Sequence, residues 1–310
     1  METKAKKGSV RRSSSMNRMT VGDKVFEVVN CIFLGLIACI ILYPLIYVVS
    51  ASFSDAMAVT SGKMWLWPVD VTLENYQQVF KNDNIMRGYR NSLIIMGSGT
   101  ALNLVMTILA AFPMSRRDLW GRDVLMKLMT YCMFFSGGLI PTYLLIAKTL
   151  KLMNNWLALI LPGALSVYNM IIMRTYFSTS IPYELHEAAE IDGCTPFGTL
   201  MRIVLPLSGP IIAVIGLYYA VGHWNSYFSA LLYINREDIQ PLQLYLRKVL
   251  TANNTQSLME MGADEAARAA MRAETIKYSV IVVSSVPMLI IYPFVQRFFV
   301  KGVMIGSVKG

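Results

Sequence analysis

Charged side chains are scarce in this sequence. Asp, Glu, Lys and Arg make up 15% of its 310 residues, whereas a soluble domain carries about 25%. Apolar residues supply 55%, and the mean hydropathy is +0.48. This balance excludes a disordered chain, a collagen and an ordinary cytosolic enzyme. The charges are mostly basic, 28 against 19, which is typical of an integral membrane protein with cationic cytoplasmic loops.

Cysteines and the motifs of enzymes are also few. Three of the four cysteines lie in apolar runs and the fourth in a polar stretch, so no pair suits an extracellular disulfide and no Cys/His spacing indicates zinc. The sequence has no phosphate-binding G-x-x-x-x-G-K-[ST] motif, since Gly62-Lys63 is followed by Met64. No Ser/His/Asp set or H-E-x-x-H motif supports a membrane-embedded enzyme.

Six apolar stretches are long enough to cross a bilayer, which takes about 20 helical residues. They are Val28–Ala51, Ser92–Phe112, Leu128–Ala147, Trp156–Tyr176, Ile211–Ile234 and Tyr278–Phe298. The first is too long for a cleaved signal peptide and has no A-x-A-like site. In the third, Gly137-Gly138 followed by Pro141 predicts a kink or a close-packing site. The sequence therefore predicts an all-α membrane protein with six transmembrane helices.

The distribution of Lys and Arg predicts the direction of the chain. Basic residues gather in the first 24 residues, after the second stretch and in the C-terminal tail. Because such residues favour the cytoplasmic side, we expect both termini inside the cell. Residues 1–24 are predicted to form a basic, disordered cytoplasmic arm that holds anionic lipid, and they lack the interleaved aromatics of a nucleic-acid-binding arm. The segments expected outside are 52–91, 148–155 and 235–277.

The connection between the fourth and fifth stretches, 177–210, is long for an inner loop. Its first half carries three glutamates at three-residue spacing, which places them along one side of a helix. Gly193 suits the end of that helix, Thr195-Pro196 can start a second helix, and Leu205-Pro206 can end it. This acidic bracket is predicted to lie flat at the inner membrane face and is suited to docking into a protein groove. The alternative is a loop that merely packs against the helices.

The same loop carries a family signature. Its fixed positions are Glu187, Ala188, Ala189, Gly193, Ile203, Leu205 and Pro206. Their spacing is E-A-A, three residues, G, nine residues, I-x-L-P. The chain thus resembles the permeases of importer-type ABC transporters, whose EAA signature has this form.

Other segments narrow the resemblance to the carbohydrate branch. Glu184-Leu185, Ile191-Asp192-Gly193, Trp224-Asn225 and the stretch 296–302 resemble permeases of the maltose MalG type. Phe135 to Pro141 and Pro241-Leu242-Gln243 are more similar to the LplC/YtcP group, which is associated with complex oligosaccharides. The resemblance covers residues 25–310 and leaves the basic arm outside.

The resemblance implies a MetI-like fold and a set of partners. Residues 25–310 would be the permease domain, with coupling helices at 183–206 and an outer loop at 235–277 that faces an extracytoplasmic solute-binding protein. Two related permeases pair in a bacterial plasma membrane, and two ATPase subunits beneath them use ATP and magnesium. By this resemblance the chain binds no cofactor and catalyses nothing; Glu187 reaches the ATPase groove and Gly193 forms the turn.

A sugar needs hydrogen bonds and aromatic faces at membrane depth. The fifth stretch offers Trp224 and Asn225 as the first candidates, followed by Tyr218 and His223. On a helix, Tyr218, Gly222 and Asn225 fall nearly on one line. These residues could instead serve as an interfacial aromatic belt or as polar contacts between helices.

Other kinds of transport fit the sequence less well. An ABC permease for an amino acid or a peptide is disfavoured by the Trp224-Asn225 pair and by the C-terminal match. A secondary transporter working alone would need coupled ionisable residues inside the stretches, and the sequence has no such chain of Asp, Glu and His.

Overall fold

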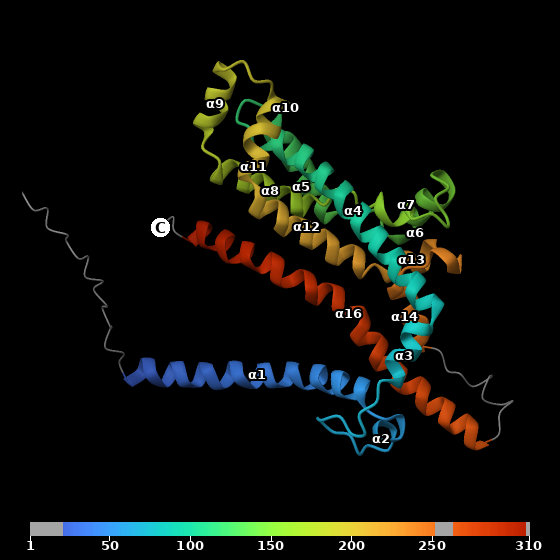
Figure 1. Cartoon of the computed structure of the whole chain (residues 1–310). Coiled ribbons are helices and arrows are strands. Elements are labelled where there is room, and N and C mark those ends of the chain that lie inside the picture. The colour runs from blue at the N-terminus through green and yellow to red at the C-terminus, as the bar shows by residue number, and fades with distance from the viewer. Residues whose placement is uncertain (1–20, 252–262, 308–310) are drawn as a thin grey trace, which may run out of the picture. The chain divides into compact units, whose positions relative to one another are not determined.

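The computed structural model describes residues 21–251 and 263–307, and this part of the chain consists of helices and connecting loops without strands (Figure 1). The chain divides into two units, residues 1–47 and 48–310. Most of the predicted basic arm lies outside the described residues, but its last four residues already belong to the first helix, α1, Val21–Phe53. None of the most apolar window of α1 is buried, so this helix presents apolar side chains in every direction, as a lipid-facing span does.

The helices of the second unit are mostly short. Their bounds are α2 Ala56–Thr60, α3 Glu74–Lys81, α4 Asp83–Ser115, α5 Arg122–Phe134, α6 Leu139–Leu144, α7 Leu157–Ile160, α8 Val167–Ser180, α9 Tyr183–Ile191, α10 Pro196–Thr199, α11 Leu205–Leu207, α12 Gly209–Trp224, α13 Tyr227–Tyr233, α14 Leu242–Thr251 and α16 Ala263–Ser307. π-helical turns follow α6 and α10, and a short 3-10 turn precedes α14.

Within residues 21–251 and 263–307, three helices are long and apolar enough to cross a membrane: α1, α4 and the part of α16 from Glu274 to Phe294. Three further pairs of helices pass the same test together but are bent, which gives up to six spans if each pair counts as one. The predicted kink is confirmed, because α5 and α6 meet at 104° and Gly138 has a φ of +83°. The all-helical prediction is therefore confirmed for the described residues, which contain fewer straight apolar spans than the sequence predicts.

Two predicted elements have different ends in the structure. The sequence predicts a continuous fifth stretch over Ile211–Ile234, but α12 ends at Trp224 and α13 begins at Tyr227. The alanine-rich segment Ala263–Ala273 predicts a short helix, but it is the first part of α16, which continues for 45 residues through Pro287 and Pro293. Apolar composition alone does not reveal where a span is interrupted.

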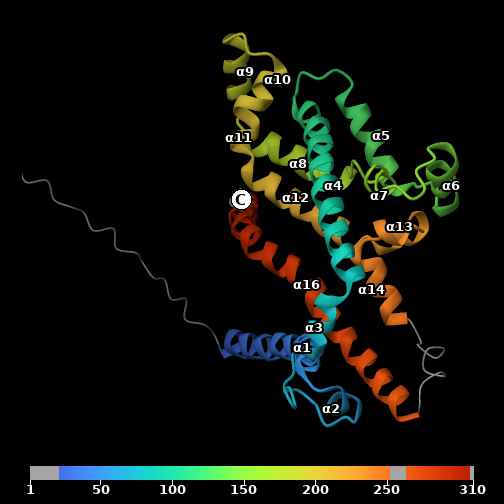
Figure 2. The ribbon, with the colours of Figure 1, turned by 45° about the vertical axis from the view of Figure 1, so that its right-hand side comes forward.

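Helix α4 is the centre of the second unit. It packs against α8, α12 and α14, while α16 packs against α12 and α3 (Figures 1 and 2). One buried apolar cluster lies near the bracket and includes Phe112, Met173 and Leu200. Since lipid tails are as apolar as these side chains, close packing and polar contacts must hold the spans together.

The first part of the predicted outer loop is held by polar side chains. The Asn154 side chain accepts the backbone N–H of Asn235 at 2.7 Å. The Asn91 amide donates to the carbonyl of Gln240 at 3.0 Å, and the Ser92 hydroxyl accepts the N–H of Leu242 at 2.9 Å. The segment that leads from α13 to α14 is therefore fixed against α4, whereas residues 252–262 of the same loop lie outside the described residues.

Candidate functional site

The predicted bracket is a helix–turn–helix in the structure (Figure 1). Helix α9 ends at Ile191, and the second arm runs from Pro196 through a π-helical turn to Leu207. The Thr195 hydroxyl accepts the N–H of Gly198 at 3.2 Å and so caps the second arm. Helical structure continues one residue beyond the predicted end at Leu205-Pro206.

The turn of the bracket explains the spacing between Ala189 and Gly193. The N–H of Cys194 donates to the carbonyl of Ala189 at 2.8 Å, and the N–H of Gly193 donates to that of Glu190 at 3.0 Å. This pair of bonds is a Schellman motif, which needs a left-handed residue at the position after the cap. Gly193 has a φ of +71°, which a side chain would disfavour.

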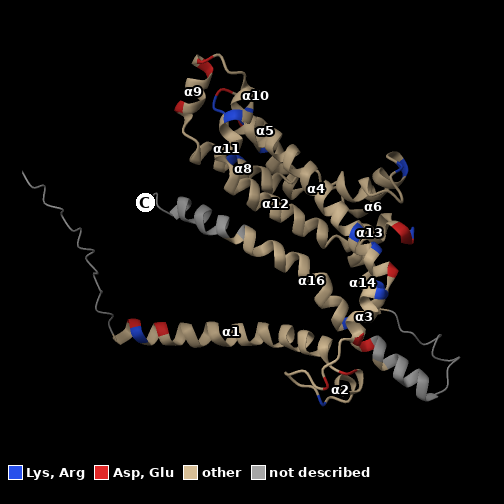
Figure 3. Ribbon diagram, viewed as in Figure 1, with Lys and Arg blue, Asp and Glu red and all other residues tan. Residues whose placement is uncertain are grey.

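The bracket has one buried and one exposed side. Ala189 packs inward, while Glu187 and Ala188 are exposed. In the second arm, Ile203 and Leu205 are half-buried and Pro206 is exposed. An acidic surface on α9 is therefore available to a partner, and Figure 3 shows it on the ribbon.

The second arm also turns sharply away from the fifth span. The axes of Pro196–Leu207 and Gly209–Trp224 differ by 85°, with the break at Ser208. If α12 runs across a membrane, a right angle places this arm along the membrane surface. The prediction of a flat bracket has this geometry in its favour.

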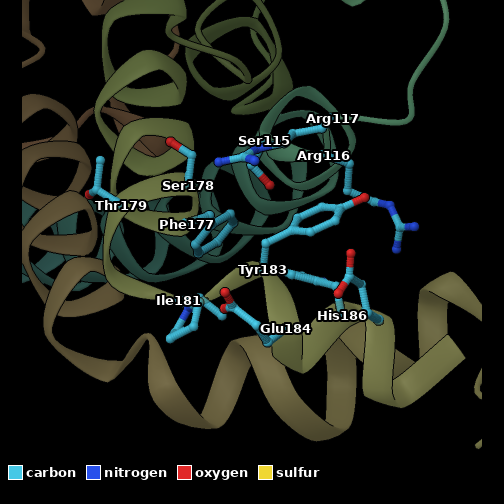
Figure 4. Close-up of a pocket in the computed structure, with 12 residues that line it drawn as sticks. Ser115, Arg116, Arg117, Phe177, Ser178, Thr179, Ile181, Tyr183, Glu184 and His186 are labelled. Atoms are coloured by element: carbon cyan, nitrogen blue, oxygen red, sulfur yellow. The ribbon is translucent and has the colours of Figure 1, made fainter. Parts of the chain in front are cut away.

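Contacts with the end of α4 hold α9 in place. His186 is buried, with its ring 6.2 Å from Phe112 and 6.0 Å from Tyr183. The guanidinium carbon of Arg117 lies 5.2 Å from the centre of the Tyr183 ring. Arg116 contacts Glu190 at 3.9 Å. A cavity of 470 Å³ opens between these segments (Figure 4).

Two ionisable groups in this region have shifted pKa values. Burial lowers the pKa of His186, and the positive charge of Arg116 lowers it further. A hydrogen bond from Arg116 lowers the pKa of Asp118, since both of its oxygens accept from that guanidinium at 2.8 Å. The nearby carboxylate of Asp118 acts in the opposite direction on His186, but burial and Arg116 outweigh it.

His223 faces α4 within the helical bundle. Its Nε2 lies 2.9 Å from the Asn103 side-chain oxygen, and the Asn103 amide donates to the carbonyl of Gly163. A Cβ on Gly99 would lie 2.5 Å from the His223 Nε2, so this glycine gives the imidazole its space. Gly163 lies in the break between α7 and α8.

A second polar contact lies one turn along α4. The hydroxyls of Thr107 and Tyr219 are 2.7 Å apart, and Tyr219 accepts the N–H of Ser166 at 3.1 Å. Neither Thr107 nor Asn103 is among the residues predicted from the sequence. Their four-residue spacing with Gly99, which places all three on one side of α4, is a signal that could have found them.

The four residues predicted to contact the sugar fall into two groups. Trp224 is buried, its indole donates to the carbonyl of Ser284 at 3.1 Å, and its ring meets Tyr89 edge-on at 5.5 Å. Trp224 and His223 thus contact other helices. Tyr218, Gly222 and Asn225, which helical spacing places nearly on one line, are all exposed.

No metal site is evident among residues 21–251 and 263–307, where no group of three His, Cys, Asp or Glu side chains could hold an ion.

Comparisons with known proteins agree with this geometry. LplC of Bacillus subtilis (strain 168) is 41% identical over 291 residues, which cover 94% of this chain and 97% of that protein. The polygalacturonan/rhamnogalacturonan transport system permease protein YtcP of the same organism is 41% identical over 290 residues, or 93% of this chain and 99% of its own. A chain in the crystal structure of a bacterial ABC transporter for import of the acidic polysaccharide alginate superposes with a TM-score of 0.81 at 32% identity, covering 91% of this chain and 99% of that one.

The family model described as the binding-protein-dependent transport system inner membrane component matches residues 12–305. This match includes the EAA signature, all of the described spans and part of the predicted basic arm. The resemblance to carbohydrate ABC permeases and to the LplC/YtcP group is thereby confirmed. The chain belongs to the family of inner membrane components of binding-protein-dependent transport systems.

Proposed function

We propose that this chain is one permease subunit of an ABC importer that carries an oligosaccharide across a bacterial plasma membrane. The observation that carries the proposal is the 41% identity, over nearly the whole chain, to a permease of a polygalacturonan/rhamnogalacturonan transport system. The fold of an alginate importer chain supports it. In this proposal both termini are cytoplasmic, and the segment 235–277 is outside, where a solute-binding protein delivers the sugar.

Energy reaches this chain through protein contact. A second, related permease and two ATPase subunits complete the proposed importer, and the ATPases use ATP and magnesium. The exposed Glu187 of α9 would enter an ATPase groove, while the buried Ala189 seats the helix on the bundle. Closure of the ATPases would then move the bracket and the helices attached to it between two states.

The proposed sugar path follows the exposed line on α12. Tyr218 and Asn225 supply an aromatic face and an amide, and Gly222 between them leaves room for a ring. Trp224 and His223 do not belong to this exposed line, because their polar atoms contact Ser284 and Asn103 of neighbouring helices.

The test is uptake of labelled oligosaccharides by cells with this gene deleted and its transporter partners intact. Wild type should restore uptake of one oligosaccharide class, and Glu187→Lys should lower it by about tenfold or more, since a paired interfacial charge is reversed. Glu74→Lys is the matched control, because Glu74 is also exposed but lies on α3, on the proposed outer side. Protein levels in the membrane should be equal for all variants.

Normal uptake with Glu187→Lys would overturn the coupling role. Uptake of peptides or amino acids in place of any oligosaccharide would overturn the substrate class and leave the family membership unchanged.

A further inference from the structure

Three residues whose side chains differ in chemistry lie near one another where α12, α13 and α14 join. Asn225 is exposed at the break after α12, and its carbonyl accepts the N–H of Tyr227 at 2.8 Å. Tyr227 begins α13 and is 44% exposed. The guanidinium carbon of Arg247, on α14, lies 5.6 Å from the centre of the Tyr227 ring. Helices α13 and α14 pack side by side at this point (Figure 2).

Two basic residues near Arg247 already have carboxylate partners. Arg236 is paired with Asp238 at 2.6 Å, and Lys248 is paired with Glu237 at 3.3 Å. Among the described residues, no carboxylate lies within 4.0 Å of the Arg247 guanidinium, which rests on an aromatic face. A guanidinium placed in this way keeps its N–H groups available for an external anion.

The three groups match the parts of a hexuronate. The C–H face of a sugar ring stacks on an aromatic side chain, the amide of Asn225 can bond ring hydroxyls, and a guanidinium binds a carboxylate through two parallel hydrogen bonds. A neutral hexose would use the first two groups and leave Arg247 without an anion. We propose that Asn225, Tyr227 and Arg247 form a contact site for a uronate residue of an anionic oligosaccharide.

The inference rests on the proposed function and narrows its substrate. Asn225 shares the exposed line on α12 with Tyr218 and Gly222, so a sugar bound at the junction lies at one end of the proposed path. In the proposed orientation this is the outer end, where substrate arrives. The site thus selects acidic sugars where they enter.

The experiment compares two substrates of the same chain length that differ only in whether the carboxylates are free or methylated. Full transporters with their binding protein and ATPases are supplied with an oligogalacturonate or with the methyl ester of the same chain length, below saturation. Wild type should take up the free acid in preference to the ester. Arg247→Gln should lower acid uptake by about 10–100-fold more than ester uptake, the loss expected for one charge-assisted contact.

Two further variants make the result specific. Arg247→Lys keeps the charge but loses the paired geometry, so its acid uptake should fall between wild type and Arg247→Gln. Arg236→Gln removes a nearby exposed arginine that already has a carboxylate partner, and it should retain the wild-type preference. Membrane levels of the variants are compared by immunoblot.

The possible outcomes separate the two proposals. An equal effect of Arg247→Gln on acid and ester, as expected if the arginine binds a lipid phosphate, would overturn the uronate site. So would a wild-type transporter that carries only the ester or another neutral oligosaccharide, and in that case the carbohydrate function stands. If the transporter takes up neither the acid, nor the ester, nor any other oligosaccharide, both the uronate site and the carbohydrate function are overturned.

Discussion

Replacing Gly193 by alanine tests whether the bracket depends on its left-handed turn. A Cβ at this position would meet no heavy atom within 4 Å, so the cost comes from the backbone alone. A left-handed residue other than glycine costs about 1–2 kcal/mol. Alanine also lowers the conformational entropy of the unfolded chain relative to glycine, and this offsets about 0.4–1 kcal/mol of the cost. A net cost of about 1 kcal/mol therefore acts on the turn that holds the two Schellman bonds.

A cost of this size changes the equilibrium of the turn by about fivefold. We expect oligosaccharide uptake driven by ATP to fall by up to about fivefold in Gly193→Ala. Gly193→Asn should keep more activity, because asparagine tolerates the left-handed region. The assay is uptake and ATP hydrolysis by the whole transporter in proteoliposomes, with the amount of bound ATPase measured for each variant.

Gly62→Ala is the matched control. Gly62 has a φ of +72°, and a Cβ there would also meet nothing within 4 Å, but this glycine follows α2, on the proposed outer side. The same backbone cost there should leave uptake near the wild-type rate. Equal losses in the two alanine variants, or an asparagine variant no better than alanine, would refute the reasoning.

Two further predictions concern histidines. Gly99→Ala should lower the thermal midpoint of the purified transporter, because overpacking against His223 costs about 1–3 kcal/mol; Gly97→Ala, with nothing within 4 Å, should not, and equal midpoints would contradict the predicted clash. Burial lowers the pKa of His186 in the folded protein. The contribution of His186 to the free energy of unfolding should therefore be fully present above about pH 6.5, the ordinary histidine pKa, and should be lost as the pH falls below that value. Thermal midpoints from about pH 7.5 to about pH 5 should show this decline in wild type but less in His186→Gln, and parallel curves would contradict it.

The bracket could be predicted because its determinants are local. The glutamate spacing, Gly193 and the Thr195-Pro196 start act within one or two turns of chain, and the structure contains the expected helices and turn. The kink after Gly137 is local in the same way. The apolar stretches could also be found, since bilayer-crossing length depends on composition over about 20 residues.

The environment of Trp224 could not be predicted, because it depends on residues far along the chain. The carbonyl that accepts its indole N–H belongs to Ser284, 60 residues away. The break after Trp224 has a similar origin: α12 and α13 pack on different partners, α12 on α4 and α13 on α14. Helical spacing separates Trp224 from the line of Tyr218 and Asn225, but it does not say which side faces the bundle.

The interruption between α7 and α8 shows what the polar residues of the spans do. Breaking a span frees backbone groups that water cannot reach, so neighbouring helices must bind them. Asn103 of α4 donates to the carbonyl of Gly163, and Tyr219 of α12 accepts the N–H of Ser166. The break is thereby tied to both helices.

These hydrogen bonds bear on how a movement of the bracket would reach the rest of the chain. Helix α8 leads into the bracket and α12 leads out of it, so both ends of the bracket belong to helices that are joined by the hydrogen bond between Tyr219 and Ser166. A force on α9 therefore acts on α8, α12 and α4 together, and we expect them to move as one body. Because Tyr218 and Asn225 lie on the exposed side of the same α12, that movement would carry the proposed sugar contacts with it.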